Sequence, residues 1–118
     1  MFIGRKPEVI LPAMEPDRDR LDDLVHRIVE AVQPLRIILF GSAARDEMGL
    51  DSDLDVLVVM PDGTHRRQAV QYLHTRMFGL GVPVDILVAT PEDLERHREN
   101  IGLIYRTILK EGRILYGV

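Results

Sequence analysis

The sequence predicts an α+β (α/β) fold, a mixed β-sheet with helices packed mainly on one face. Three short apolar runs, at 36–40, 54–60 and 82–89, are bounded by glycine, proline or aspartate as buried strands are. Residues 64–80 show helical spacing, which permits a parallel strand–helix–strand unit between the second and third runs. The connection between the first two runs is too short for a crossover helix, so we expect those strands to pair antiparallel.

The first predicted helix follows Pro16. Its apolar positions recur at helical spacing and are Leu21, Leu24, Val25, Ile28, Val29 and Val32. Asp17 is the expected N-cap, and Pro34 ends the helix.

Two further helices are predicted. Residues 64–80 place Val70, Leu73, Met77 and Leu80 on one face, and glycines at 79 and 81 close the helix. Thr90-Pro91-Glu92-Asp93 resembles a capping box with proline at the first helical position. The helix that starts there continues, with a break at 100–102, through residues 104–109 to Gly112.

Composition limits the function classes. The 118 residues fit one domain, 1–118, in which 1–15 form an arm that is either an edge strand or a docking segment. A net charge of -4 argues against direct nucleic-acid binding, and the absence of cysteine excludes thiolate catalysis and thiolate metal sites. Neither a membrane span nor a signal peptide is recognisable, so we expect a cytoplasmic protein.

Two carboxylates interrupt the second apolar run, and one interrupts the third. On a strand, Asp53 and Asp55 share one face, while Leu54 points to the opposite, apolar side. If the second and third strands are neighbours, Asp85 joins them. Three anions packed together repel one another unless cations neutralise them, and oxygen ligands favour Mg²⁺ or Mn²⁺.

The bend after the first strand offers an anion site. Gly41 lets the backbone approach a ligand, and Ser42 opens a short helical turn that leads to Arg45. Backbone N–H groups at a helix start, a hydroxyl and a guanidinium can hold phosphates. Together with metal-binding carboxylates, these are the parts that phosphoryl-type transfer needs. Ser42 as an ordinary N-cap is compatible with this role.

Gly41-Ser42, ten residues, then Asp53-Leu54-Asp55 resembles the signature of the nucleotidyltransferases related to DNA polymerase β, and the match includes Arg45 and Ser52. The resemblance implies Asp53 and Asp55 as ligands of both metals, Asp85 as ligand of the catalytic metal and base, and Gly41 and Ser42 as the triphosphate cradle. Arg45 either meets phosphate or pairs with a carboxylate such as Asp51. Asp46 departs from the family's usual glycine and adds an acid near the phosphates.

Within this superfamily the chain is most similar to the minimal nucleotidyltransferases, stand-alone domains that serve as antitoxins beside a helical HEPN partner. That resemblance implies Mg²⁺-dependent transfer of AMP from ATP to a hydroxyl of a partner protein. Two alternatives are a non-catalytic antitoxin that neutralises its partner by complex formation, and an aminoglycoside-type transferase for small molecules. The oligomeric state stays open between homo- and hetero-oligomers.

The remaining charged residues are expected on solvated faces. The four histidines lack the spacing of metal ligands, so surface or packing roles are expected for His26, His65, His74 and His97. Arg66-Arg67 and the charges at 95–98 either face solvent or form part of a partner surface.

Overall fold

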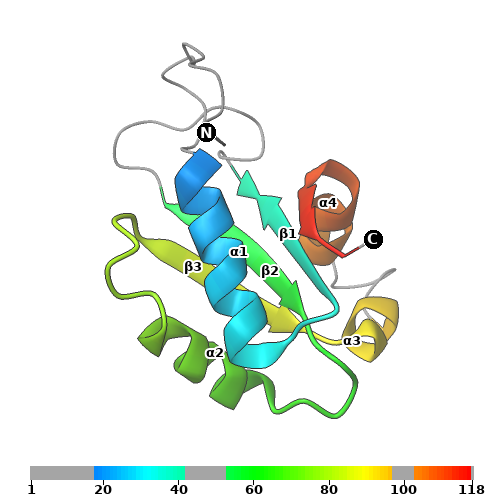
Figure 1. Ribbon diagram of the computed structural model, residues 1–118. Helices are drawn as coiled ribbons and strands as arrows, with labels where there is room; N and C mark the ends of the chain where they lie inside the picture. The colour runs from blue at the N-terminus through cyan, green and yellow to red at the C-terminus, as the bar shows by residue number, and fades with distance from the viewer. Residues whose placement is uncertain (1–17, 42–52, 97–102, 118) are drawn as a thin grey trace.

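The structure is a computed structural model that describes residues 18–41, 53–96 and 103–117. In these ranges four strands form one mixed sheet in the order β3-β2-β1-β4 (Figure 1). The elements are α1 (Arg18–Val32), β1 (Arg36–Phe40), β2 (Leu54–Val59), α2 (Arg66–Thr75), β3 (Val84–Ala89), α3 (Pro91–Arg96), α4 (Leu103–Glu111) and β4 (Arg113–Tyr116). β1 pairs antiparallel with β2 and β4, while β2 pairs parallel with β3. The predicted fold class and both predicted pairings are confirmed.

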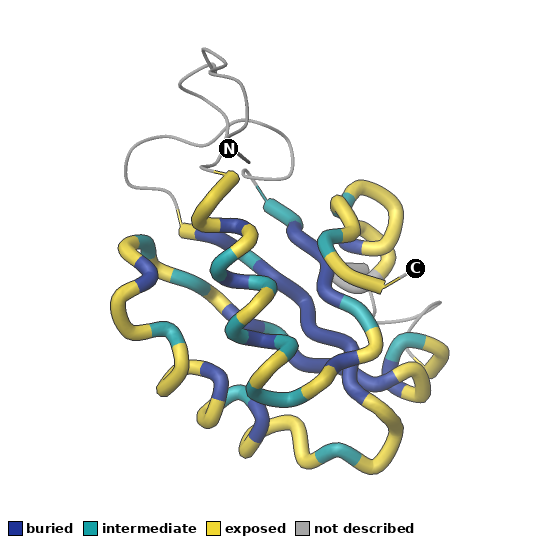
Figure 2. The backbone as a smooth tube through the Cα atoms, viewed as in Figure 1, coloured by how far each residue is buried: buried dark blue, intermediate teal, exposed yellow. Residues whose placement is uncertain are grey.

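One face of the sheet holds the larger hydrophobic core, and α1 and α2 cover it. Alternation along the strands sends Ile37 and Leu39 of β1, and Val56 and Val58 of β2, to this face. Leu24 of α1 packs against them, and all of these side chains are buried. The outer sides of both helices stay exposed, and buried residues concentrate on the central strands (Figure 2).

The opposite face carries a smaller core. Ile38, Leu57 and Val59 point to it and pack with Ile108 of α4. Leu94 of α3 is half-buried against the same group. Because α3 and α4 are short, the two longer helices, α1 and α2, give the first face its fuller cover, as predicted (Figure 1).

The helix α1 matches its prediction and ends in a left-handed residue. Gln33 has φ +51° and donates its N–H to the Val29 carbonyl at 3.0 Å, which closes the last turn before Pro34. The predicted N-cap, Asp17, lies outside the described residues.

The helix α2 is shorter than predicted. It begins after His65, whose Nδ1 accepts from Gln68 N–H at 3.3 Å, and it ends at Thr75. Arg27 of α1 fixes the chain beyond it by donating to the carbonyls of Arg76 (3.0 Å) and Phe78 (2.6 Å). Met77 and Leu80 therefore reach the core from turns instead of from a helix, and β3 begins at residue 84 instead of 82.

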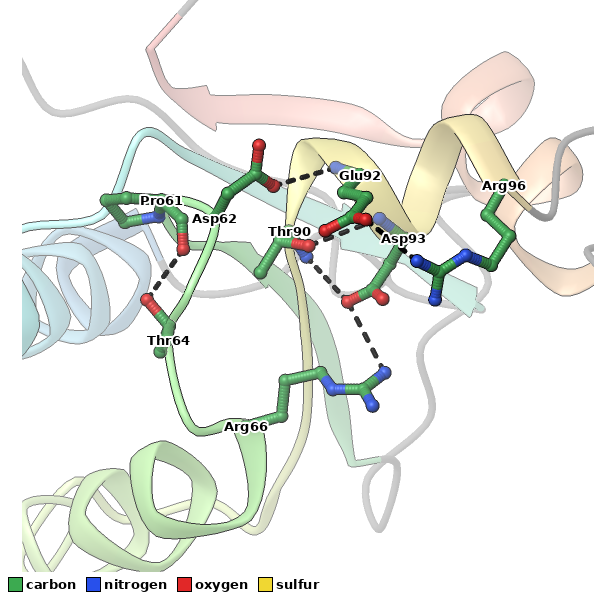
Figure 3. Close-up of polar contacts among 8 residues, drawn as sticks. All are labelled: Pro61, Asp62, Thr64, Arg66, Thr90, Glu92, Asp93 and Arg96. Carbon is green, nitrogen blue, oxygen red and sulfur yellow. Dashed lines mark hydrogen bonds and ion pairs between the residues drawn. The ribbon is translucent and has the colours of Figure 1, made fainter.

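The carboxyl-terminal part combines a confirmed cap with a strand that was not predicted. Thr90 and Asp93 form the capping box, with Thr90 N–H donating to Asp93 Oδ2 at 3.0 Å and Asp93 N–H to Thr90 Oγ1 at 3.1 Å (Figure 3). Gly112 N–H donates to the Ile108 carbonyl at 2.8 Å and ends α4. The break expected at 100–102 lies outside the described residues. None of the described helices combines the length and apolarity needed to cross a bilayer.

Candidate functional site

The carboxylates gather where the two parallel strands begin. Asp55 on β2 stands in register with Asp85 on β3, so their side chains leave the same face of the sheet. Asp53 lies two residues before Asp55 and shares that face. The predicted adjacency of Asp85 to the other two acids is confirmed. Asp53 and Asp85 are exposed, whereas Asp55 is half-buried.

The register that aligns these acids is fixed by their neighbours. Leu54 and Val56 flank Asp55 and are buried in the larger core, so a one-residue slip would move both out of that core to the opposite face of the sheet. At the start of the pairing, Leu54 N–H donates to the Pro83 carbonyl at 2.9 Å. The apolar side of β2 therefore holds the acidic side in place.

The electrostatic environment of Asp55 disfavours its charge. Burial raises the pKa of the Asp55 carboxyl, and the nearby charges of Asp85 and then Asp53 raise that pKa further. The three carboxylates therefore repel one another across one small surface. A bound cation would relieve that repulsion.

The backbone at Gly41 lies close to the Asp55 carboxylate. Gly41 follows β1 directly and has φ +75°, a conformation that favours glycine. A Cβ at this position would collide with the Asp55 carboxylate. Glycine is therefore needed here both for the bend and for the space that Asp55 occupies. Ser42, Arg45 and Ser52 lie outside the described residues.

The donor set fits an oxygen-preferring divalent ion by its chemistry. Three carboxylates on one face, one of them with a raised pKa, match the ligands that Mg²⁺ and Mn²⁺ prefer. Within the described ranges no three acidic or histidine side chains already stand as a closed metal cluster. Because Asp53 and Asp85 are exposed, their side chains have room to turn toward an ion.

Sequence reasoning overlooked two neighbours of the acids. Pro83 supplies the carbonyl that starts the β2–β3 pairing. Phe40 stands in register with Asp55 on β1, is half-buried and packs with the smaller core. The sequence held a signal for Phe40. It is the last residue before Gly41, and antiparallel pairing of the strands at 36–40 and 54–60 sets it opposite Asp55.

The three histidines in the described ranges lie on the surface, as predicted. His26 lies 3.1 Å from Glu30 on the exposed side of α1, and His65 caps α2. His74 is exposed, and His97 lies outside the described residues.

Comparisons with known proteins agree with this geometry. The chain is similar to a crystal structure of a toxin–antitoxin with AMP-PNP, at 20% identity and a TM-score of 0.57 over 83% of this chain and 73% of that one. It is also similar to a crystal structure of a mutant of the toxin–antitoxin MntA–HpeT, at 17% identity and a TM-score of 0.57 over 88% of this chain and 75% of that one. These two similarities show that the chain shares the fold of those structures.

Among curated proteins no sequence matches. The family described as the nucleotidyltransferase domain matches residues 21–115, which is most of the chain and includes Gly41, Asp53, Asp55 and Asp85. The chain therefore belongs to the nucleotidyltransferase domain family.

Proposed function

We propose that this chain transfers AMP from ATP to a hydroxyl group of a partner protein and that a divalent metal ion is required. The main support is the register that pairs Asp55 with Asp85 on the face shared by Asp53, beside the bend at Gly41. In the proposed reaction the acceptor oxygen forms a bond to the α-phosphorus of ATP, the bond to pyrophosphate breaks, and the hydroxyl proton leaves with a base.

The roles proposed for the residues follow their positions. Asp53 and Asp55 would hold both metal ions, and Asp85 would hold the catalytic ion and accept the hydroxyl proton, for which its exposure suits it. Gly41 and Ser42 would hold the triphosphate, with Arg45 and Ser52 beside it. Bound Mg²⁺ or Mn²⁺ would neutralise the phosphate charge that develops during transfer.

The proposed acceptor is a toxin of HEPN type in the cytoplasm, with this chain as its antitoxin. The two similar structures are toxin–antitoxin complexes, and one of them contains AMP-PNP. Since their identity to this chain is low, they support the choice of partner by analogy of fold alone.

The test joins this chain with the protein encoded beside its gene. The purified pair receives Mg²⁺ and ATP labelled at the α-phosphate, and the intact mass of the partner is measured. We expect the partner to gain one or more nucleotidyl units, and the variant Asp53→Asn/Asp55→Asn to abolish the gain. Asp22→Asn, an exposed acid on α1, is the matched control and should leave transfer unchanged.

Two results would contradict the proposal. Label transfer that survives the double change would remove the acids from the reaction. A partner that stays unmodified yet remains neutralised by Asp53→Asn/Asp55→Asn/Asp85→Asn would favour an antitoxin that acts by binding alone.

A further inference from the structure

A groove lies at the outer edge of the sheet, away from the carboxylates. It has a volume of about 770 Å³ and runs between the start of α2 and the middle of β3, with Ile86 and Val88 on the strand side. Asp53, Asp55 and Asp85 are not among its lining residues. The groove therefore needs an explanation separate from nucleotide chemistry.

The strand side of the groove presents backbone groups that can pair with another strand. β3 is the outermost strand of the described sheet, so no described strand pairs with its other edge. Pro83 and Ala89 both direct their carbonyls to β2, accepting from Leu54 and Met60 N–H. Because backbone direction alternates along a strand, Ile86 and Val88 direct their N–H and C=O groups away from β2, toward the free edge along which the groove lies.

The helix side of the groove is cationic. Arg66 and Arg67 line it beside the N-cap residue His65, and no Asp or Glu does, although the whole chain has a net charge of -4. Arg66 forms an ion pair with Asp93 at 3.3 Å (Figure 3). Arg67 is exposed and makes no hydrogen bond or ion pair that involves another described residue. Its charge is therefore available to a ligand.

The lining favours a polypeptide over a nucleic acid. Single-stranded nucleic acids are usually held by aromatic side chains on which the bases stack, and none lines this groove. Outward backbone groups of an edge strand instead match the hydrogen-bonding groups of an extended peptide.

We propose that this groove binds an extended acidic segment of a partner protein, which adds a strand to the outer edge of β3. Alternate side chains of such a strand would face α2 and meet Arg66 and Arg67, so acids are expected at every second position. The side chains between them would lie on the opposite face of the sheet, next to the half-buried Leu87, and are expected to be apolar.

The test uses a capped hexapeptide of alternating glutamate and valine with the full-length chain. We expect the backbone amide NMR signals of Ile86 and Val88 to shift with peptide concentration. Their hydrogen exchange should slow as well. The same peptide with N-methyl groups on alternate residues keeps its charge but loses the pairing donors, so it should not produce these shifts.

Charge variants distinguish binding in the groove from nonspecific electrostatic attraction of the peptide to the protein surface. Arg67→Glu should weaken binding of the glutamate peptide by about fivefold and strengthen binding of the matching lysine–valine peptide. Arg76→Glu, an exposed arginine just beyond α2 that does not line the groove, should leave both affinities unchanged.

Four results would overturn the proposal. These are the absence of shifts at Ile86 and Val88, equal shifts with the lysine–valine peptide, and stronger shifts with hexauridylate than with the peptide. The fourth is sedimentation showing a dimer of this chain in which Ile86 and Val88 are already protected from hydrogen exchange without the peptide. None of these four measurements uses ATP. They can therefore fail or succeed independently of the proposed transferase reaction.

Discussion

Asp55 occupies a position at which its own charge is unfavourable in the folded chain. Because its pKa is raised, the folded protein binds a proton at Asp55 more readily than the unfolded chain does. Stability due to this group therefore increases as the pH falls through the raised pKa, and it is lost as the pH rises through the same interval. At neutral pH the ionised carboxylate lowers the free energy of unfolding.

Asp55→Asn should therefore raise the melting temperature in EDTA at pH 7. The expected increase is small, about 1 to 3 °C, since solvent screens a half-exposed site. It should shrink on acidification, as Asp55 becomes protonated in the parent protein. Thermal unfolding followed by circular dichroism between pH 4 and 7 measures it, and a variant that is less stable than the parent at pH 7 would contradict it.

Magnesium should reverse the order of the melting temperatures of the parent protein and Asp55→Asn. Ion binding to the folded state alone stabilises it by about 1.4 kcal/mol when the ion is at ten times its Kd. We expect Mg²⁺ to raise the melting temperature of the parent and of Asp22→Asn, and to leave Asp55→Asn almost unchanged. Equal stabilisation of all three proteins would place the ion elsewhere.

Alanine substitutions at Gly41 and Gly63 distinguish the cost of backbone strain from the cost of steric crowding. Both glycines have positive φ, +75° and +93°, but a Cβ on Gly41 meets the Asp55 carboxylate whereas one on Gly63 meets nothing within 4 Å. Gly63→Ala should cost about 1 kcal/mol of stability, and Gly41→Ala clearly more, up to about 3 kcal/mol. Gly41→Ala should also weaken Mg²⁺ binding. Urea unfolding and a magnesium titration test both, and equal losses of stability would refute the crowding.

At the scale of elements, the cap of α3 connects neighbouring parts of the fold. Asp93 is buried, holds Thr90 N–H and pairs with Arg66, so the box ties β3, α3 and α2 together. Thr90→Ala should cost about 1 kcal/mol, and Asp93→Ala about 1 to 3 kcal/mol, because it leaves a buried N–H without its acceptor.

Glu92→Ala is the control for this cap. Glu92 is exposed and pairs with Arg96 at 2.8 Å on the surface of α3, so its loss should cost less than about 1 kcal/mol. Urea unfolding of Thr90→Ala, Asp93→Ala and Glu92→Ala measures the loss of stability in each variant. A Glu92→Ala protein as unstable as Asp93→Ala would show that the box does not anchor α3.

The elements differ in how far the sequence predicted them. The alternation of Leu54 and Val56 with Asp53 and Asp55 determines which side of β2 faces the larger core, and it led to the correct grouping of Asp85 with the other acids. The end of α2 was not predictable, because it depends on Arg27, which contacts the carbonyls beyond the helix from another element. β4 was missed because its four residues include an Ile114 that is 52% exposed, so no buried face appears in its pattern.

At the scale of the whole molecule, β1 and β2 contribute side chains to both hydrophobic cores, so the two faces should unfold together. Ile108 of α4 is 2% exposed in the smaller core, while its neighbour Leu109 is 44% exposed. Ile108→Ala should cost about 2 to 5 kcal/mol and Leu109→Ala less than about 1 kcal/mol. Chemical unfolding followed both by circular dichroism and by NMR should give coincident transitions. Separate transitions for the two faces would contradict this coupling.

The parallel pairing of β2 with β3 also has a consequence for the order of events during synthesis. Asp53 and Asp55 leave the ribosome about thirty residues before Asp85 does, and they gain their third companion only when β3 docks beside β2. A nascent chain that stops at the turn around Gly63 would hold two acids of the three. The ion binding proposed for this surface would therefore report that β3 has docked on β2. Two fragments severed at that turn would recover ion binding only by reassociating.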